Sequence, residues 1–221
     1  MYRECYAFAK KIKGEKMEKK LDFFYIGDSY GGNQDWCLDH MMQLGGCAAI
    51  TACDSALYFA LHHGKPSLYK GTLEKPDQDE YLYFTEEMKE YLHPRWSGID
   101  KPEIYVEGFT RFLENKGEKV TMTILPGTAD EREAEERIME QIEKDLPVPI
   151  LILNHENPAM EDYVWHWFLL IGYRYDGENA LSEEGRFQVQ TLTYSEAKWV
   201  DFRSLWNTGR EAKGGIILYS L

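Results

Sequence analysis

Long apolar runs and basic residues are scarce in this sequence, and its cysteines follow no regular spacing. No segment approaches the ~18 apolar residues that a membrane helix needs, so we expect no membrane contact. The first twenty residues, MYRECYAFAKKIKGEKMEKK, lack the apolar core of a secretory signal. These absences favour a cytoplasmic protein. Its four cysteines, Cys5, Cys37, Cys47 and Cys53, are then expected to be free thiols.

The charge balance disfavours two classes of partner. Lysine and arginine total 25 against 38 acidic residues, which gives a formal net charge of −13. Proteins that bind nucleic acid through its phosphates are usually basic, and an acidic protein is not attracted to anionic lipid. We therefore expect neither nucleic acid nor a membrane surface as a partner. The sequence does not indicate an oligomeric state.

Aromatic residues, by contrast, are abundant. They form 14% of the chain and apolar residues form 43%, a composition typical of folded globular proteins rather than disordered ones. A length of 221 residues suits one domain with a sizeable core. Because the sequence contains no internal repeat and no low-complexity linker, we expect a single domain over residues 1–221.

Helical patterns dominate the first part of the chain. Residues 1–20 predict an N-terminal helical extension, with an amphipathic helix over Tyr2–Lys19. Residues 21–146 predict a mainly helical half, although a strand is expected up to Gly27 and another at 118–125. The strongest signal is Cys47–His62, which is apolar on nearly all sides and therefore predicts a buried helix. Further helices are expected at Asp79–Leu92, at Ile104–Asn115 and at 128–146, the last with Thr128 or Asp130 as its N-cap.

Residues 147–221 predict a mainly β half. Strand patterns occur at 148–153, 164–173, 186–194, 197–202 and 214–220. Helices thus precede antiparallel-looking strands, and such segregation predicts an α+β fold in which a helical half packs on a sheet.

Cys47 is the first candidate for chemistry. It follows Gly45 and Gly46, which allow a tight turn, and it begins the predicted buried helix. Unsatisfied N–H groups and the positive end of the helix dipole favour a thiolate at such a position, and the thiolate is the nucleophile. The alternative is that Cys47 is a small buried residue at a crowded turn.

His166 and Gln34 are candidate partners for that thiol. His166 lies at the head of an apolar strand between Trp165 and Trp167, which are expected in the core. It can exchange a proton with Cys47, or it can be a core histidine that bonds a backbone carbonyl. The Gln34 amide can donate to an oxyanion together with the backbone N–H of Cys47, or it can be an ordinary loop side chain.

Taken together, NQDW, then GGCAAITA opening a helix, then a distant HWFLLIGY strand resemble the papain-like cysteine peptidases. The nearest branch resembles the bacterial peptidases that process double-glycine leader peptides. The resemblance implies a papain-like fold with the nucleophile at Cys47, the base at His166 and the oxyanion donor at Gln34. It implies a peptide or small amide as substrate, and neither a cofactor nor a metal.

The sequence departs from the family pattern at two places. The family usually has Cys-Gly-Pro where this chain has Cys47-Ala48-Ala49, and alanine preserves the helix start. The family also places Asp or Asn on the strand after the histidine, to orient its ring. This chain offers Thr191, Thr193 or Ser195 there, of which we select Thr193; Asp201, after a further strand, fits less well. A neutral partner stabilises an imidazolium less than a carboxylate does.

The sequence contains two rivals to these candidates, a possible zinc site and a second histidine. Cys37 and His40 have a zinc-like spacing, with Cys47, Cys53, His62 and His63 downstream, but no second closely spaced ligand pair follows. His155 is a rival base at a strand end.

The leading hypothesis is a cysteine peptidase or amide hydrolase; the alternatives are an inactive papain-like binding protein and an amide-directed acyltransferase on the same fold.

Overall fold

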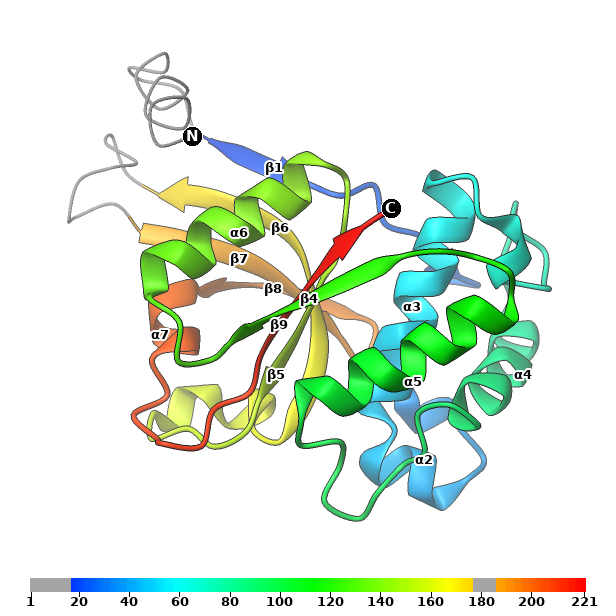
Figure 1. Cartoon of the computed structure of the whole chain (residues 1–221), viewed down its shortest axis with the longest axis horizontal. Coiled ribbons are helices and arrows are strands. Elements are labelled where there is room, and N and C mark those ends of the chain that lie inside the picture. The colour runs from blue at the N-terminus through cyan, green and yellow to red at the C-terminus, as the bar shows by residue number, and fades with distance from the viewer. Residues whose placement is uncertain (1–16, 177–185) are drawn as a thin grey trace.

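The computed structural model describes residues 17–176 and 186–221, which form a mixed α and β structure with an antiparallel sheet (Figure 1). The predicted α+β class is confirmed at that level. No helix within the described ranges has the length and apolar character to cross a membrane.

The central sheet has seven strands among the described residues, and every neighbouring pair is antiparallel. Its order is β4-β9-β5-β6-β7-β8, and β1 lies beside β6 beyond the end of β5. Its strands are β1 (Glu18–Lys20), β4 (Thr121–Pro126), β5 (Val148–Ile152), β6 (His166–Asp176), β7 (Arg186–Thr193), β8 (Glu196–Asp201) and β9 (Gly215–Ser220). A separate hairpin pairs β2 (Tyr25–Ile26) with β3 (Ser29–Tyr30).

Most of the helices form one group beside the sheet, where α3 contacts β6 and α5 contacts β4 and β9 (Figure 1). Figure 1 shows α2, α3, α4 and α5 clustered together, while α6 lies across the sheet and α7 lies at its far edge. The helices are α2 (His40–Gly45), α3 (Cys47–His62), α4 (Gln78–Lys89), α5 (Pro102–Asn115), α6 (Glu131–Glu143) and α7 (Phe202–Trp206). Short 3-10 turns are η1 (Gln34–Trp36), η2 (Pro66–Leu68) and η3 (Pro158–Tyr163).

The predicted buried helix is present as α3. Its residues from Cys47 to Ala60 are all buried, because α3 packs against β6 on one side and against α4 and η2 on others. A helix enclosed in this way needs apolar residues around its whole circumference. The buried Asp54 is therefore an exception that needs a local explanation.

Several predicted elements differ from the structure. Residues 1–16, where most of the expected N-terminal helix falls, lie outside the described residues, and Glu18–Lys20 is a strand rather than the end of that helix. This strand completes the edge of β6 where β5 has ended, so that a tertiary pairing overrides the helical pattern. The strand expected up to Gly27 is only Tyr25–Ile26. The helices α2 and α7 were not predicted, and Asp130 rather than Thr128 caps α6.

The side chain of Gln141 on α6 completes the hydrogen bonding of β9. Its Nε2 donates to the Tyr219 carbonyl at 3.1 Å, and its Oε1 accepts from the Tyr219 N–H at 2.8 Å. β9 pairs with β5 only at Ile150 and Leu151, so β5 supplies no partner this far along β9. The amide of Gln141 thus replaces a missing strand.

We expect Gln141→Met to destabilise the protein by about 2 to 4 kcal/mol, because two buried backbone groups lose their partners. The measurement is urea-induced unfolding. Glu140→Met on the same helix is the control, since Glu140 makes a surface ion pair with Arg137, and such pairs contribute little to stability. Equal effects of the two substitutions would contradict this role of Gln141.

Candidate active site

The junction between α2 and α3 is built on two glycines that are needed for space. A Cβ on Gly45 would lie 2.1 Å from the Arg95 carbonyl oxygen, and one on Gly46 would lie 2.3 Å from the Met42 carbonyl oxygen. Gly46 has a φ of −87°, which any residue can adopt, so the sharp turn does not require a left-handed backbone. The glycines instead let the chain approach its neighbours closely enough for Cys47 to begin α3.

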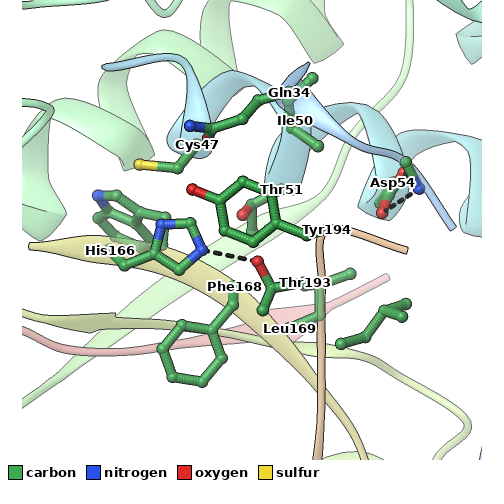
Figure 2. A pocket seen from close by; sticks show the side chains of 13 residues that line it. Gln34, Cys47, Ile50, Thr51, Asp54, His166, Phe168, Leu169, Thr193 and Tyr194 are labelled. Carbon is green, nitrogen blue, oxygen red and sulfur yellow. Dashed lines mark hydrogen bonds between the residues drawn. The ribbon is translucent and has the colours of Figure 1, made fainter. Parts of the chain in front are cut away.

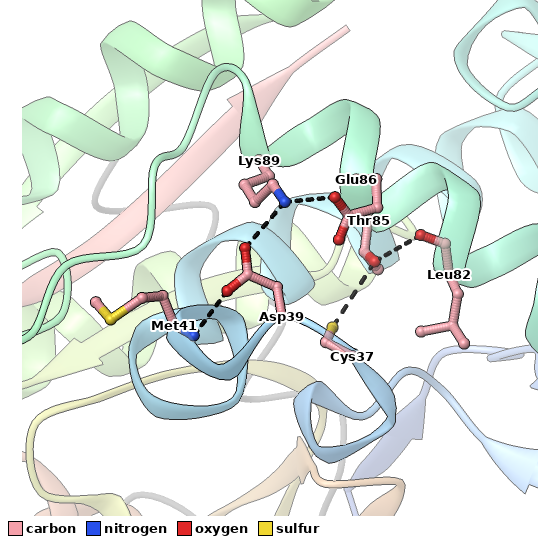
Figure 3. Close-up of polar contacts among 7 residues, drawn as sticks. All are labelled: Cys37, Asp39, Met41, Leu82, Thr85, Glu86 and Lys89. Carbon is pink, nitrogen blue, oxygen red and sulfur yellow. Dashed lines mark hydrogen bonds and ion pairs between the residues drawn. The ribbon is translucent and has the colours of Figure 1, made fainter.

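Hydrogen bonds and ion pairs between the start of α2 and α4 support this junction. Asp39 caps α2 by accepting from the Met41 N–H at 2.8 Å, and Lys89 on α4 bonds both Asp39 and Glu86 (Figure 3). The pKa of Asp39 is lowered, chiefly by its hydrogen bond with Lys89. These contacts attach the short helix α2 to α4, and thereby fix the segment that leads to Cys47.

Cys47 is the first residue of α3 and is 6% exposed. Burial raises the pKa of its thiol, while the backbone N–H groups of Trp167, Ala48 and Cys47 itself act in the opposite direction. The predicted position at a helix start is confirmed. The expected preference for a thiolate is wrong for the enclosed site, because the loss of hydration outweighs the helix N-terminus.

His166 is the first residue of β6 and is 7% exposed. Its Nε2 lies 2.6 Å from Thr193 Oγ1, at the end of the neighbouring strand β7. That contact occupies one ring nitrogen and leaves Nδ1, which faces Cys47 and Tyr194 in Figure 2. Burial lowers the pKa of His166 to about 4, so the ring is neutral at physiological pH.

Gln34 lies in η1 and is also buried. Its Nε2 donates one hydrogen to the Gln43 carbonyl at 2.7 Å, and Gln43 in turn donates to the Cys37 carbonyl at 2.8 Å. An amide nitrogen carries two hydrogens, so one remains for another acceptor. The amide is thereby held in one orientation.

These four predicted residues line one small cavity of about 20 Å³ (Figure 2). Its walls also include Gly32, Ile50, Thr51, Asp54, Trp167, Phe168, Leu169, Leu192 and Tyr194. The helical half supplies Gln34 and Cys47, and the sheet supplies His166 and Thr193. The structure therefore brings together all four residues that the sequence singled out.

Tyr194 is the residue at this site that the sequence did not indicate. Its ring stacks on His166 with centroids 5.2 Å apart and planes 7° apart. Burial, then Cys47 and Asp35, raises its pKa to about 12. Tyr194 was expected as the last residue of the strand at 186–194, whereas β7 ends at Thr193, so only its position after Thr193 could have suggested a role.

Asp54 on α3 links the helical side of the cavity, through Gly32, to the turn after β7. Its carboxylate accepts from the Gly32 N–H, at 3.1 Å to each oxygen, and from the Tyr81 hydroxyl at 2.7 Å. The Gly32 carbonyl accepts in turn from the Ser195 N–H at 3.2 Å. Only glycine fits at position 32, since a Cβ there would lie 2.0 Å from the Tyr81 oxygen. Burial raises the pKa of Asp54 to about 7.

The other candidate bases and orienting groups have structural roles. His155 accepts from the Asn157 N–H at Nδ1 and contacts the Ser204 carbonyl through Nε2, so both nitrogens are occupied. Asp201 caps α7. Thr191 contacts Tyr163 and the Lys198 carbonyl.

The two Trp residues beside His166 differ. Trp167 is buried and stacks on Tyr105, as expected. The expectation for Trp165 is wrong: it is 47% exposed, because a φ of 53° turns the chain just before β6.

The alternative zinc site does not assemble in the described part of the chain. No group of three or more His, Cys, Asp or Glu residues there is arranged to hold a metal ion. Cys37 contacts Thr85 Oγ1 at 3.7 Å (Figure 3), and Cys53 faces the Phe84 carbonyl in the buried middle of α3.

Asp54 makes stability depend on pH in a definite direction. Its pKa is raised from 3.8 to about 7, so the unfolded chain ionises at lower pH than the folded protein. Stability therefore falls as pH rises from about 4 to 7 and stays lower above that range. We expect the stability of Asp54→Asn relative to the original protein to increase by roughly 4 kcal/mol between pH 4 and pH 8.

Urea unfolding at several pH values measures this difference. Tyr81→Phe is the matched variant with the opposite expectation: it removes a hydrogen bond that lowers the pKa of Asp54, so the fall in stability with pH should be larger. A pH-independent difference between Asp54→Asn and the original protein would contradict the assignment.

Comparison with known proteins does not assign a family. The chain matches no protein-family model, and its sequence matches no curated protein. The chemical interpretation of the cavity therefore depends on its own residues: a buried thiol at a helix start, an imidazole bonded to a threonine, and an oriented amide.

Proposed function

We propose that this protein is a papain-like hydrolase that cleaves an amide bond in a peptide or small amide through the Cys47 thiol. The supporting observation is the convergence, in one cavity, of a helix-start cysteine, a histidine with one ring nitrogen left free, and a glutamine amide. The chemistry needs no cofactor. It requires a nucleophile, a base and oxyanion donors, and each has a candidate among these residues.

The first half of the reaction begins with the thiol. His166 Nδ1 takes the proton from Cys47 Sγ, and Nε2–H donates to Thr193 Oγ1 so that the ring keeps its orientation. The thiolate attacks the carbonyl carbon, and the oxyanion accepts from Gln34 Nε2–H and from the Cys47 N–H. This N–H lies in the first turn of α3 and has no acceptor within the helix. The C–N bond then breaks, and Nδ1 protonates the leaving amine to leave a thioester.

Hydrolysis of the thioester uses the same groups. His166 Nδ1 takes a proton from water, and the resulting oxygen attacks the thioester carbon. The same donors stabilise the second oxyanion. Collapse releases the carboxylic acid, and the sulfur regains its proton from His166.

The resting pair is a neutral thiol and a neutral imidazole. Burial raises the pKa of Cys47 and lowers that of His166, so both shifts oppose charge separation. Opening the site to water or binding a substrate whose carbonyl accepts from the oxyanion donors would reduce this opposition. The thiolate–imidazolium pair of Cys47 and His166 is thus expected to be a minor form until the site opens or a substrate binds.

The second candidate function is that of a binding protein that keeps Cys47, His166 and Gln34 in place but does not catalyse hydrolysis. The observations that favour it are the neutral resting pair and the uncharged partner Thr193, which stabilises an imidazolium less than a carboxylate would. The two functions predict different reactivity for the thiol.

The first test is alkylation by iodoacetamide between pH 3.5 and 9, with each cysteine followed by peptide mass mapping. For the hydrolase, Cys47 should react ahead of the buried Cys37 and Cys53, and its rate should fall only near pH 4, where His166 gains a proton. His166→Ala should remove that plateau, so that the rate of Cys47 labelling rises continuously with pH up to pH 9, because burial raises the pKa of the thiol. Equal, slow labelling of all the cysteines would favour the binding protein.

The second test changes the partner of His166. Thr193→Asp places a carboxylate beside Nε2, which should raise the pKa of His166 and move the acidic limit of Cys47 alkylation upward by about one pH unit or more. Thr193→Val has a similar volume and no hydroxyl, so it should slow alkylation without moving the limit upward. An acidic limit that is unchanged in Thr193→Asp would show that Thr193 does not orient the base.

A further inference from the structure

The cavity above Cys47 is too small for the proposed substrate. Its volume of about 20 Å³ is enough for roughly one water molecule. Cys47 and His166 are 6% and 7% exposed, so neither is open to an amide from solvent. Some wall of the cavity must move before a carbonyl carbon can reach the sulfur.

Tyr194 is the wall that is best placed to move. Tyr194 is 40% exposed, whereas Gln34, Cys47 and His166, which line the same cavity, are buried. Its ring lies flat on His166, and its hydroxyl points into the space between Cys47 and His166 (Figure 2). That space is where the carbonyl of a substrate would have to lie. The hydroxyl of Tyr194 therefore occupies the reaction site, while the residue as a whole is partly open to solvent (Figure 2).

The backbone beneath Tyr194 is held in place. Thr193 pairs with Glu196, so Tyr194 and Ser195 form a two-residue turn between β7 and β8, with φ values of 50° and 60°. Such turns favour Asn and Gly, so Tyr at this position has a conformational cost. Ser195 offsets it by donating from its N–H to the Gly32 carbonyl at 3.2 Å and from its Oγ to the Gly31 carbonyl at 3.2 Å.

We infer that Tyr194 is a gate that determines the size of group admitted to Cys47. Rotation about its Cα–Cβ bond lifts the ring from His166 and opens the sulfur, while the tethered turn stays in place. This inference rests on the proposed function only for the identity of the substrate, an acyl group that reaches Cys47 through the gate. The gate itself concerns access to the thiol.

The experiment compares two thiol reagents of different size on the whole 221-residue chain. Iodoacetamide is the small probe and fluorescein maleimide is the bulky one, with labelling at Cys47 followed by peptide mass mapping. In the original protein the bulky reagent should be strongly disfavoured relative to the small one. Tyr194→Asn should raise the bulky rate at least about tenfold, since minor open conformations typically hold a tenth of the population or less. The rate with iodoacetamide should rise less.

Three further variants make the comparison decisive. Tyr194→Gly should behave like Tyr194→Asn; both residues suit a positive φ, so the turn should be preserved. Tyr194→Phe keeps the ring and should retain the discrimination by size. Tyr83→Asn, on the exposed face of α4, should label like the original protein.

Unchanged bulky labelling in both Tyr194→Asn and Tyr194→Gly would overturn the gate. A peptide-hydrolysis assay on the same variants separates the two proposals. Faster bulky labelling without hydrolysis by any variant supports the gate and removes the hydrolase, whereas hydrolysis with unchanged labelling does the reverse.

Discussion

The site depends above all on the contact between α3 and β6. The first residue of α3 is Cys47 and the first residue of β6 is His166, so packing one element on the other brings two side chains from distant parts of the sequence into one cavity. This contact needs a helix that is apolar on every side and a chain that can approach closely at Gly45 and Gly46. The same packing removes water from both reactive groups.

Removal of water decides the resting protonation. A helix N-terminus stabilises this thiolate by less than burial destabilises it, and no charged partner among the described residues lies beside His166 to offset its own loss of hydration. The result is a neutral thiol and a neutral imidazole in one cavity, and we propose that charge separation between them is coupled to opening of that cavity. An arrangement of this kind restrains the thiol from reacting with solutes before a specific ligand enters.

A chain of hydrogen bonds joins the two sides of the site. Asp54 on α3 holds Gly32, and Gly32 holds Ser195 at the tip of the β7–β8 hairpin. The neighbours of these residues are Gln34 on one side and Tyr194, with Thr193, on the other. A buried carboxyl is costly, and its position here is explained by the N–H group and the tyrosine hydroxyl that it bonds.

Apart from Thr193, which only the resemblance to the papain-like cysteine peptidases suggested, local patterns and residue types were sufficient to predict the buried helix at Cys47–His62, the later strands, the α+β class, and Gln34, Cys47 and His166 as candidates. These follow from local patterns: the apolar face of a helix, the alternation of strands, and residue types placed where elements begin and end. The tertiary structure decided what local patterns do not contain. It made Glu18–Lys20 a strand, because β6 had an unpaired edge, and it gave Gly45 and Gly46 a steric rather than a conformational role. It also stacked Tyr194 on His166 in the cavity that holds the thiol and kept Cys47 and His166 uncharged, because stacking and burial arise only when distant segments pack together.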